Sequence, residues 1–287
     1  MQGLSWSMLR GLPLKIGALC TVLTVTAYFG IDEFTKYQQR QEIALRAESI
    51  VRHLLPDLSK RSFHEKVDSV RRFIRAHSTN DSAGEFVAFS GRTFYDYWKD
   101  YPFMLDSMIR HASKPMPKIE LDCSTQSAIM TQILEQLGIE HRRVAVYRHA
   151  PNYPGHSFLE VFNYETDKWE VQDPHFDIFW RHIPTDMRAS IEELVGSPYS
   201  DIEPCLSDGM CGWDIANEEG YKPRNIKPYL GLASVVDRKR RQRPLFVNEG
   251  RFPLAQATEI EGGSPLTYCE YRAKNCRESI LRFRTRE

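Results

Sequence analysis

Two strands and a turn can be read in one short stretch of the chain. Residues 156–174 read HSFLEVFNYETDKWEVQDP. Apolar and polar residues alternate from His156 to Phe162, which is typical of a half-buried strand, and Trp169 to Asp173 repeat the pattern after a polar turn. The stretch therefore predicts an antiparallel hairpin with His156 and Asp173 at its open end.

The register of this hairpin decides how close the two polar ends lie. A turn centred between Tyr164 and Glu165 puts His156 directly opposite Asp173, whereas a turn at 165–168 offsets them by four residues. Side chains directly opposite each other have Cβ atoms about 5 Å apart, within reach of an imidazole–carboxylate hydrogen bond. The sequence leaves both registers open.

A helix that begins beside a cysteine precedes the hairpin. Asp122 is a suitable N-cap, and an apolar face follows it as far as Gly138, which fits the end of a helix. Cys123 then falls in the first helical turn, near the positive end of the helix dipole. A thiol attacks an acyl carbon only as thiolate, which such a dipole and an adjacent imidazolium both favour. We predict Cys123 as nucleophile, His156 as its base and Asp173 as the group that orients the base.

Four segments of the middle of the chain are, in order, CSTQSAIM (123–130), LGIEHRRV (137–144), HSFLEV (156–161) and WEVQDP (169–174). Together they resemble the core of the transglutaminase-like superfamily, over about residues 67–174. The resemblance implies a cysteine at the start of a helix packed on an antiparallel sheet, with histidine and aspartate on adjacent strands. By matching positions, it implies Cys123, His156 and Asp173 as nucleophile, base and orienting acid.

Departures from the family pattern limit what the resemblance implies about the reaction. Phe158 stands where the family usually has tryptophan. Cys123 is flanked by Asp122 and Ser124, not by the glutamine and tryptophan of animal protein-crosslinking members. No D-x-D-x-D-G calcium loop is visible in the sequence. The resemblance thus supports the fold and the triad more than crosslinking, and we predict neither a cofactor nor a metal ion.

The predicted fold is α+β, with N-terminal helices packed on the antiparallel sheet of a transglutaminase-like, cysteine-protease-like core. One helix is expected from Phe34 to Leu55, ended by Pro56, and another after a capping box at 62–65. The predicted parts of the chain are a cytoplasmic N-terminus with a membrane anchor (1–31), a stalk or packing helix (32–60), the catalytic core (61–185) and a C-terminal extension (186–287).

A long apolar segment lies near the N-terminus. Residues 12–31 read LPLKIGALCTVLTVTAYFGI, with Lys15 as the only charge, and about 20 apolar residues span a bilayer as a helix. Basic residues precede the segment and acidic residues follow it, which places the N-terminus in the cytoplasm. We predict a single-pass protein of a bacterial inner membrane with its catalytic domain in the periplasm. A signal peptide cleaved near 25–27 and a buried core helix are the alternatives.

The cysteines fit a location outside the cytoplasm. Cys205 with Cys211 and Cys269 with Cys276 are the pairings with the shortest loops, although four cysteines allow three pairings and free buried thiols stay an alternative. Neither pair has the C-x-x-C spacing of a zinc site. Cys123 is left over as the thiol for chemistry.

Two features of the site stay open in the sequence. The backbone N–H of Cys123 is one candidate donor to an oxyanion, and the second is Gln126, Trp98 or a loop amide. Three histidines, at positions 141, 149 and 175, offer an alternative metal site with Cys123, but no H-x-x-x-H spacing supports it.

The predicted function is thiol-dependent acyl transfer or hydrolysis on amide bonds, through a thioester. The expected partner is a protein or peptide of the cell envelope. Nucleic acid is not expected, because 38 basic residues balance 38 acidic ones and phosphate recognition needs a net basic face. The alternatives are a non-catalytic binding or scaffold protein on the same fold, and a cysteine peptidase.

Overall fold

The computed structural model describes residues 33–80, 85–146, 155–215, 222–230, 232–236 and 242–247. The chain divides into two compact units, residues 1–45 and 46–287, and the sheet and the predicted site lie in the second. The predicted membrane anchor, residues 12–31, lies outside the described residues. None of the described helices is long and apolar enough to cross a bilayer.

Helices make up most of the chain before the sheet. Residues 33–49 are α-helical, and the π-helical segment η1 (Ile50–Leu54) continues them to just before Pro56, where the sequence predicts the end of this helix. Helix α2 (Phe63–His77) begins at the predicted capping box, in which the Ser62 N–H donates to the Glu65 carboxylate at 2.8 Å. The other helices are η2 (Leu58–Lys60), α3 (Glu85–Ser90), α4 (Phe94–Tyr97), α5 (Tyr101–Ser113), α6 (Cys123–Gln136), η3 (Ile183–Thr185), α7 (Ile191–Gly196) and η4 (Pro223–Tyr229).

Eight strands of the described chain form one sheet, in the order β10-β9-β3-β4-β5-β6-β7, and β8 also pairs with β6. Every pair in this sheet is antiparallel. The bounds are β3 (His141–Val146), β4 (His156–Asn163), β5 (Lys168–Asp173), β6 (Ile178–His182), β7 (Met187–Arg188), β8 (Ile202–Leu206), β9 (Leu232–Val236) and β10 (Gln242–Val247), and β1 (Ser78–Thr79) pairs in parallel with β2 (Ile119–Glu120). The predicted α+β class with an antiparallel sheet is confirmed.

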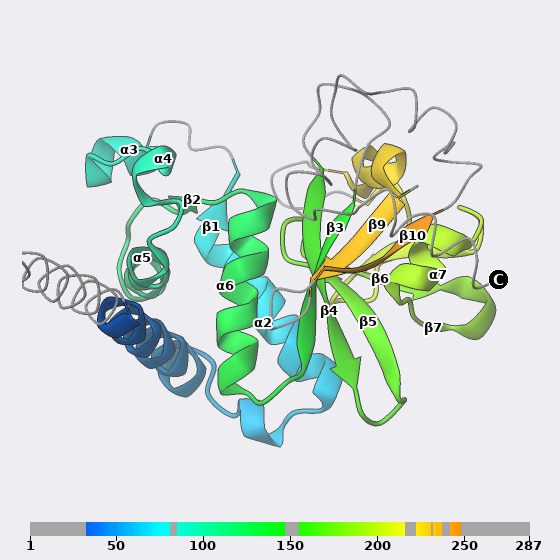
Figure 1. Ribbon diagram of the computed structural model, residues 1–287, viewed down its shortest axis with the longest axis horizontal. Helices are drawn as coiled ribbons and strands as arrows, with labels where there is room; N and C mark the ends of the chain where they lie inside the picture. Colours follow the sequence, from blue (N-terminus) through cyan, green and yellow to red (C-terminus); the bar gives the residue numbers. More distant parts are fainter. Residues whose placement is uncertain are drawn as a thin grey trace, which may run out of the picture. The chain divides into compact units, whose positions relative to one another are not determined.

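The two faces of the sheet have different neighbours. On one face, Phe158 of β4 belongs to an apolar cluster with Val171 and Trp180, and α7 supplies further members of that cluster. Side chains alternate along a strand, so Leu159 and Val161 point to the other face. Helix α6 packs on β3 and β4, and α2 packs on α6, as Figure 1 shows. His156 shares the face of Phe158, and its ring interacts with Cys123, the first residue of α6.

The sheet extends well beyond the hairpin along the chain. Strands β7 to β10 belong to the segment that the sequence sets apart as a C-terminal extension, residues 186–287, yet β7 and β8 pair with β6 of the core, and β9 pairs with β3. In Figure 1, β9 and β10 continue the sheet past β3. The described part of this segment therefore completes the same sheet.

Candidate active site

Cys123 is the first residue of α6, as the sequence predicts. The side chain of Asp122 caps this helix and accepts a hydrogen bond from the Thr125 backbone N–H at 2.6 Å. Cys123 is a free, half-buried thiol. The first N–H groups of a helix have no partner inside the helix, and its dipole is positive at this end. The sulfur therefore lies where negative charge is stabilised.

The register of the hairpin differs from both registers that the sequence left open. Leu159 pairs with Gln172. Continuing this register by one residue puts Asp173 opposite Phe158, so Asp173 lies two residues away from a position directly opposite His156. The directly opposite register and the four-residue offset are both wrong. Because the offset is an even number, the two polar side chains still lie on one face of the sheet.

The predicted contact between the histidine and the acid is nevertheless made. Nε2 of His156 lies 2.7 Å from Oδ2 of Asp173. Both side chains are buried, and Asp173 is fully so. Diagonal neighbours on adjacent strands are within reach of long or aromatic side chains, and the imidazole ring spans the gap.

The charges around His156 favour its protonated form. Burial opposes the imidazolium, but the carboxylate of Asp173 outweighs it through its charge and its hydrogen bond, and Cys123 adds to the effect in both ways, so the pKa of His156 rises to about 10. Because Cys123 hydrogen-bonds His156, its thiol lies next to the imidazole ring. Because Nε2 faces Asp173, Nδ1 is the nitrogen left for the sulfur. The structure brings the three predicted residues together, while their catalytic role stays a prediction.

Aromatic rings enclose His156 on several sides. The centroids of Phe158, His175 and Phe176 lie 5.6, 5.2 and 5.5 Å from the centroid of its ring. Phe158, which stands where the family usually has tryptophan, is fully buried. An apolar surrounding of this kind excludes water and strengthens the interactions between His156 and the charges beside it.

Two of the donors considered for an oxyanion have other roles. Gln126 is fully buried, its Nε2 donates to Ser78 Oγ at 3.0 Å, and its Oε1 lies 3.0 Å from Nδ1 of His175. Trp98 is 41% exposed, and the ammonium of Lys99 lies 4.1 Å from the centroid of its ring. Gln126 is therefore committed to buried partners. The N–H of the first helical residue remains the donor that the geometry favours.

The alternative metal site finds no support among the described residues. His141 is buried on β3, and its Nδ1 lies 2.9 Å from the carbonyl oxygen of Ile139. His175 contacts Gln126, and residue 149 lies outside the described residues. Within the described part of the chain, one group of possible ligands is close enough to hold a metal ion, and it consists of Glu203, Cys205 and Cys211.

Two of those three residues are joined to each other. Cys205 of β8 and Cys211 form a disulfide bond, which confirms one of the two pairings expected from short loops. The other pair, Cys269 and Cys276, lies outside the described residues. The disulfide leaves these thiols unable to bind a metal ion.

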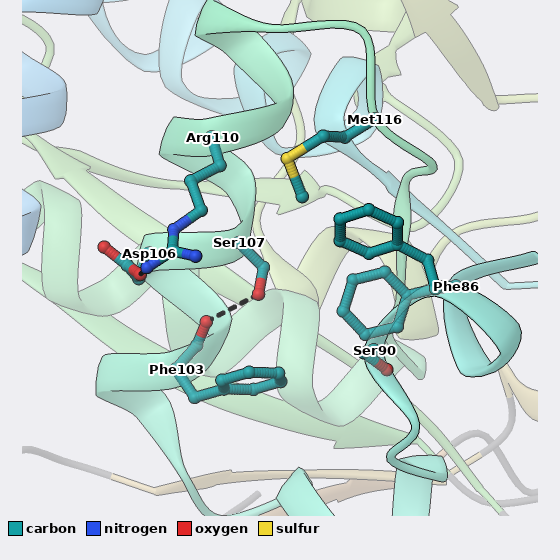
Figure 2. A pocket seen from close by; sticks show the side chains of 8 residues that line it. Phe86, Ser90, Phe103, Asp106, Ser107, Arg110 and Met116 are labelled. Atoms are coloured by element: carbon teal, nitrogen blue, oxygen red, sulfur yellow. Dashed lines mark hydrogen bonds and ion pairs between the residues drawn. The ribbon is translucent and has the colours of Figure 1, made fainter.

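A separate pocket of about 280 Å³ lies between α3 and α5. Figure 2 shows Phe86 and Met116 facing each other across it, with the ion pair of Arg110 and Asp106 at its edge, 2.8 Å long. Other lining side chains are Phe89, Ser90, Phe103 and Ser107. None of the three predicted catalytic residues lines it.

Comparisons with known proteins found no match, neither among protein-family models nor among curated protein sequences. The resemblance to the transglutaminase-like superfamily therefore rests on the quoted sequence segments. What the geometry adds is the position of Cys123 at a helix N-terminus and the contact between His156 and Asp173.

Proposed function

We propose that this protein is a transglutaminase-like cysteine enzyme that performs acyl transfer or hydrolysis on amide bonds. The observation that carries the proposal is the position of the His156 ring, which hydrogen-bonds Asp173 and contacts Cys123 at the start of α6. A nucleophile, a base and a group that orients the base within contact distance form the unit of thiol catalysis.

The first half of the proposed reaction makes a thioester. The Cys123 thiolate attacks the carbonyl carbon of an amide, a C–S bond forms, and the carbonyl electron pair moves to oxygen. The N–H at the start of α6 stabilises that oxyanion. The C–N bond then breaks, Nδ1 of His156 gives its proton to the leaving nitrogen, and ammonia or an amine departs. Asp173 holds the ring in place during this transfer.

The second half returns the enzyme to its starting state. Neutral His156 takes a proton from water or from a primary amine, whose oxygen or nitrogen attacks the thioester carbon. The C–S bond breaks and leaves the Cys123 thiolate beside the His156 imidazolium. Water gives a carboxylic acid, and an amine gives a new amide. The two outcomes share every residue of the site.

The proposed location is the periplasmic side of a bacterial inner membrane. The disulfide between Cys205 and Cys211 supports a compartment outside the reducing cytoplasm. The apolar segment 12–31 supports a membrane anchor. Proteins or peptides of the cell envelope are then the proposed substrates.

The test offers peptide amides, glutamine side chains among them, to the full chain and measures both ammonia release and incorporation of a fluorescent primary amine. Activity is expected in the wild type and in Ser124→Ala, the matched control beside the nucleophile. Cys123→Ala is expected to lower the rate by about a thousandfold or more, because the nucleophile of such a unit is removed. Activity that survives in Cys123→Ala would reject the proposal.

A further inference from the structure

Four buried or half-buried side chains behind the His156 ring form a continuous chain of hydrogen bonds. Ser78 Oγ donates to the carbonyl oxygen of Ile74 at 2.7 Å. Nε2 of Gln126 donates to Ser78 Oγ at 3.0 Å. Nδ1 of His175 lies 3.0 Å from Gln126 Oε1, and Nδ2 of Asn80 lies 2.9 Å from His175 Nε2. The hydrogen-bond chain therefore runs from α2, through β1 and α6, to the loop after β5.

The direction of every bond in this hydrogen-bond chain follows from its end. A carbonyl only accepts, so Ser78 donates to Ile74 and must accept from Gln126. That turns the amide oxygen of Gln126 toward His175, whose Nδ1 must then carry a proton. With Nδ1 as donor, Nε2 accepts from the Asn80 amide. His175 is thus fixed as the neutral Nδ1–H tautomer.

Burial and the nearby charges also favour the neutral form of His175. Burial, first, and then the charge of His156 lower the pKa of His175 to about 3, with a further contribution from Arg75, while the charge of Asp173 opposes them. Gln126 and Asn80 face the ring as neutral amides. Between about pH 3 and about pH 10, His175 is therefore uncharged while His156 is charged.

His175 touches both members of the His156–Asp173 pair. Its ring meets the ring of His156 edge to face, with centroids 5.2 Å apart and planes at 68°. Its backbone N–H donates to Oδ1 of Asp173 at 3.0 Å, which leaves Oδ2 for His156. A charge on His175 would lie directly against the imidazolium that the proposed mechanism needs.

We propose that His175 is a positioning residue, held in its neutral tautomer by Gln126 and Asn80, that orients Asp173 and allows His156 to keep its proton beside Cys123. This inference rests on the proposed function, since it concerns the activation of the same thiol. Gln126 and Asn80 act through His175.

The first test measures the tautomer directly. NMR of ring-labelled histidine in the full chain is expected to show His175 as the Nδ1–H form, with no titration between about pH 5 and pH 8. A His175 that carries its proton on Nε2, or that titrates near the ordinary pKa of about 6.5, would overturn the inference.

The second test measures the pKa of His156 by NMR titration of the full chain. His175→Lys places a positive charge against the His156 ring, about 5 Å away, and is expected to lower the pKa of His156 by about one unit or more. His175→Gln, the matched control, keeps this position uncharged and is expected to leave the pKa of His156 within about half a unit of the wild-type value. The same samples are treated with iodoacetamide at about pH 6, and alkylation of Cys123 is read by peptide mass spectrometry.

The two proposals fail in different ways in this experiment. Wild-type Cys123 that reacts at about pH 6 no faster than an ordinary thiol would reject the proposed function. A wild-type thiol that is reactive at that pH, together with a His156 pKa that His175→Lys leaves unchanged or that His175→Gln lowers by as much, would overturn the role of His175 alone.

Discussion

Replacing Arg71 by methionine tests how the hairpin that carries Asp173 is fixed to α2. The Arg71 side chain is fully buried and makes an ion pair with Asp68 at 2.9 Å. Its Nε donates to Asp177 at 3.0 Å, its Nη2 to Ser207 at 2.6 Å, and its Nη1 to Gln172. One guanidinium thus joins α2 to the end of β5, the loop after it and the end of β8.

The expected loss of stability follows from the charges that the substitution leaves behind. Asp68 keeps a partner, because Arg188 donates to both of its oxygens at 2.9 and 2.7 Å. Asp177 is half-buried, and desolvation raises its pKa while Arg71 opposes that rise. Removing one partner of a buried ion pair costs about 3–5 kcal/mol. Since Asp68 is still paired, we expect a loss of about 3 kcal/mol in the free energy of unfolding.

Urea titration of the full chain, followed by tryptophan fluorescence, measures this loss. Arg72→Met is the matched control, since Arg72 is the neighbouring, exposed arginine of α2, and it is expected to change stability by less than about 0.5 kcal/mol. Adding Asp177→Asn to Arg71→Met removes the unpaired charge and is expected to recover about 1 kcal/mol or more. A loss below about 1 kcal/mol for Arg71→Met, or no recovery in the double variant, would refute the reasoning.

The remaining predictions concern the cap of α6, the charge on His156 and the disulfide. Asp122→Ala removes the cap of α6 and is expected to lower the free energy of unfolding by about 1 kcal/mol, whereas Asp122→Asn retains most of it; urea titration compares them, and equal losses would contradict the capping role. The pKa of His156 is raised to about 10 from 6.5, so the stabilisation that its protonated ring contributes is complete below pH 6.5 and is lost as the pH rises through about 10. Asp173→Asn is expected to lower this pKa by about one to three units in an NMR titration, and an unchanged value would argue against the pairing. Replacing Cys205 and Cys211 together by serine opens a short loop and is expected to cost about 2 kcal/mol in thermal unfolding, and no loss would show that the disulfide does not constrain the unfolded chain.

Capping residues, which act over a few positions in the sequence, were sufficient to predict where helices begin. The cap at Asp122 sets the start of α6 and hence the position of Cys123, and the box formed by Ser62 with Glu65 begins α2. A capping side chain bonds to backbone only two or three residues away, so its effect is visible in a short stretch of sequence. These helix starts are confirmed.

Predicting the register of the hairpin requires knowing which residues form its turn. Asn163 pairs with Lys168, and Asp167 adopts a left-handed backbone conformation with φ of 53°. Aspartate tolerates this conformation better than most residues, which makes residues 164–167 the turn. The aspartate just before the second strand was the available signal for the observed register.

Pairings between distant segments could not be predicted in the same way. Strand β9 pairs with β3, although Arg143 and Val236 are 93 residues apart in the sequence, and neither strand specifies its partner by pattern. The hydrogen bonds of His175 likewise join side chains from α6 and from the end of β1. Contacts of this kind depend on how the elements pack, which no periodicity encodes.

The central claim is that Cys123 acts as a nucleophile because His156 is beside it. Incubating the full chain with p-nitrophenyl acetate, an activated acyl donor, tests it without knowledge of the natural substrate. We expect a burst of p-nitrophenol and an acetyl group on the Cys123 peptide in the wild type, and neither in His156→Gln. Acetylation of Cys123 that is equally fast in His156→Gln, or none at Cys123 in the wild type, would contradict the account.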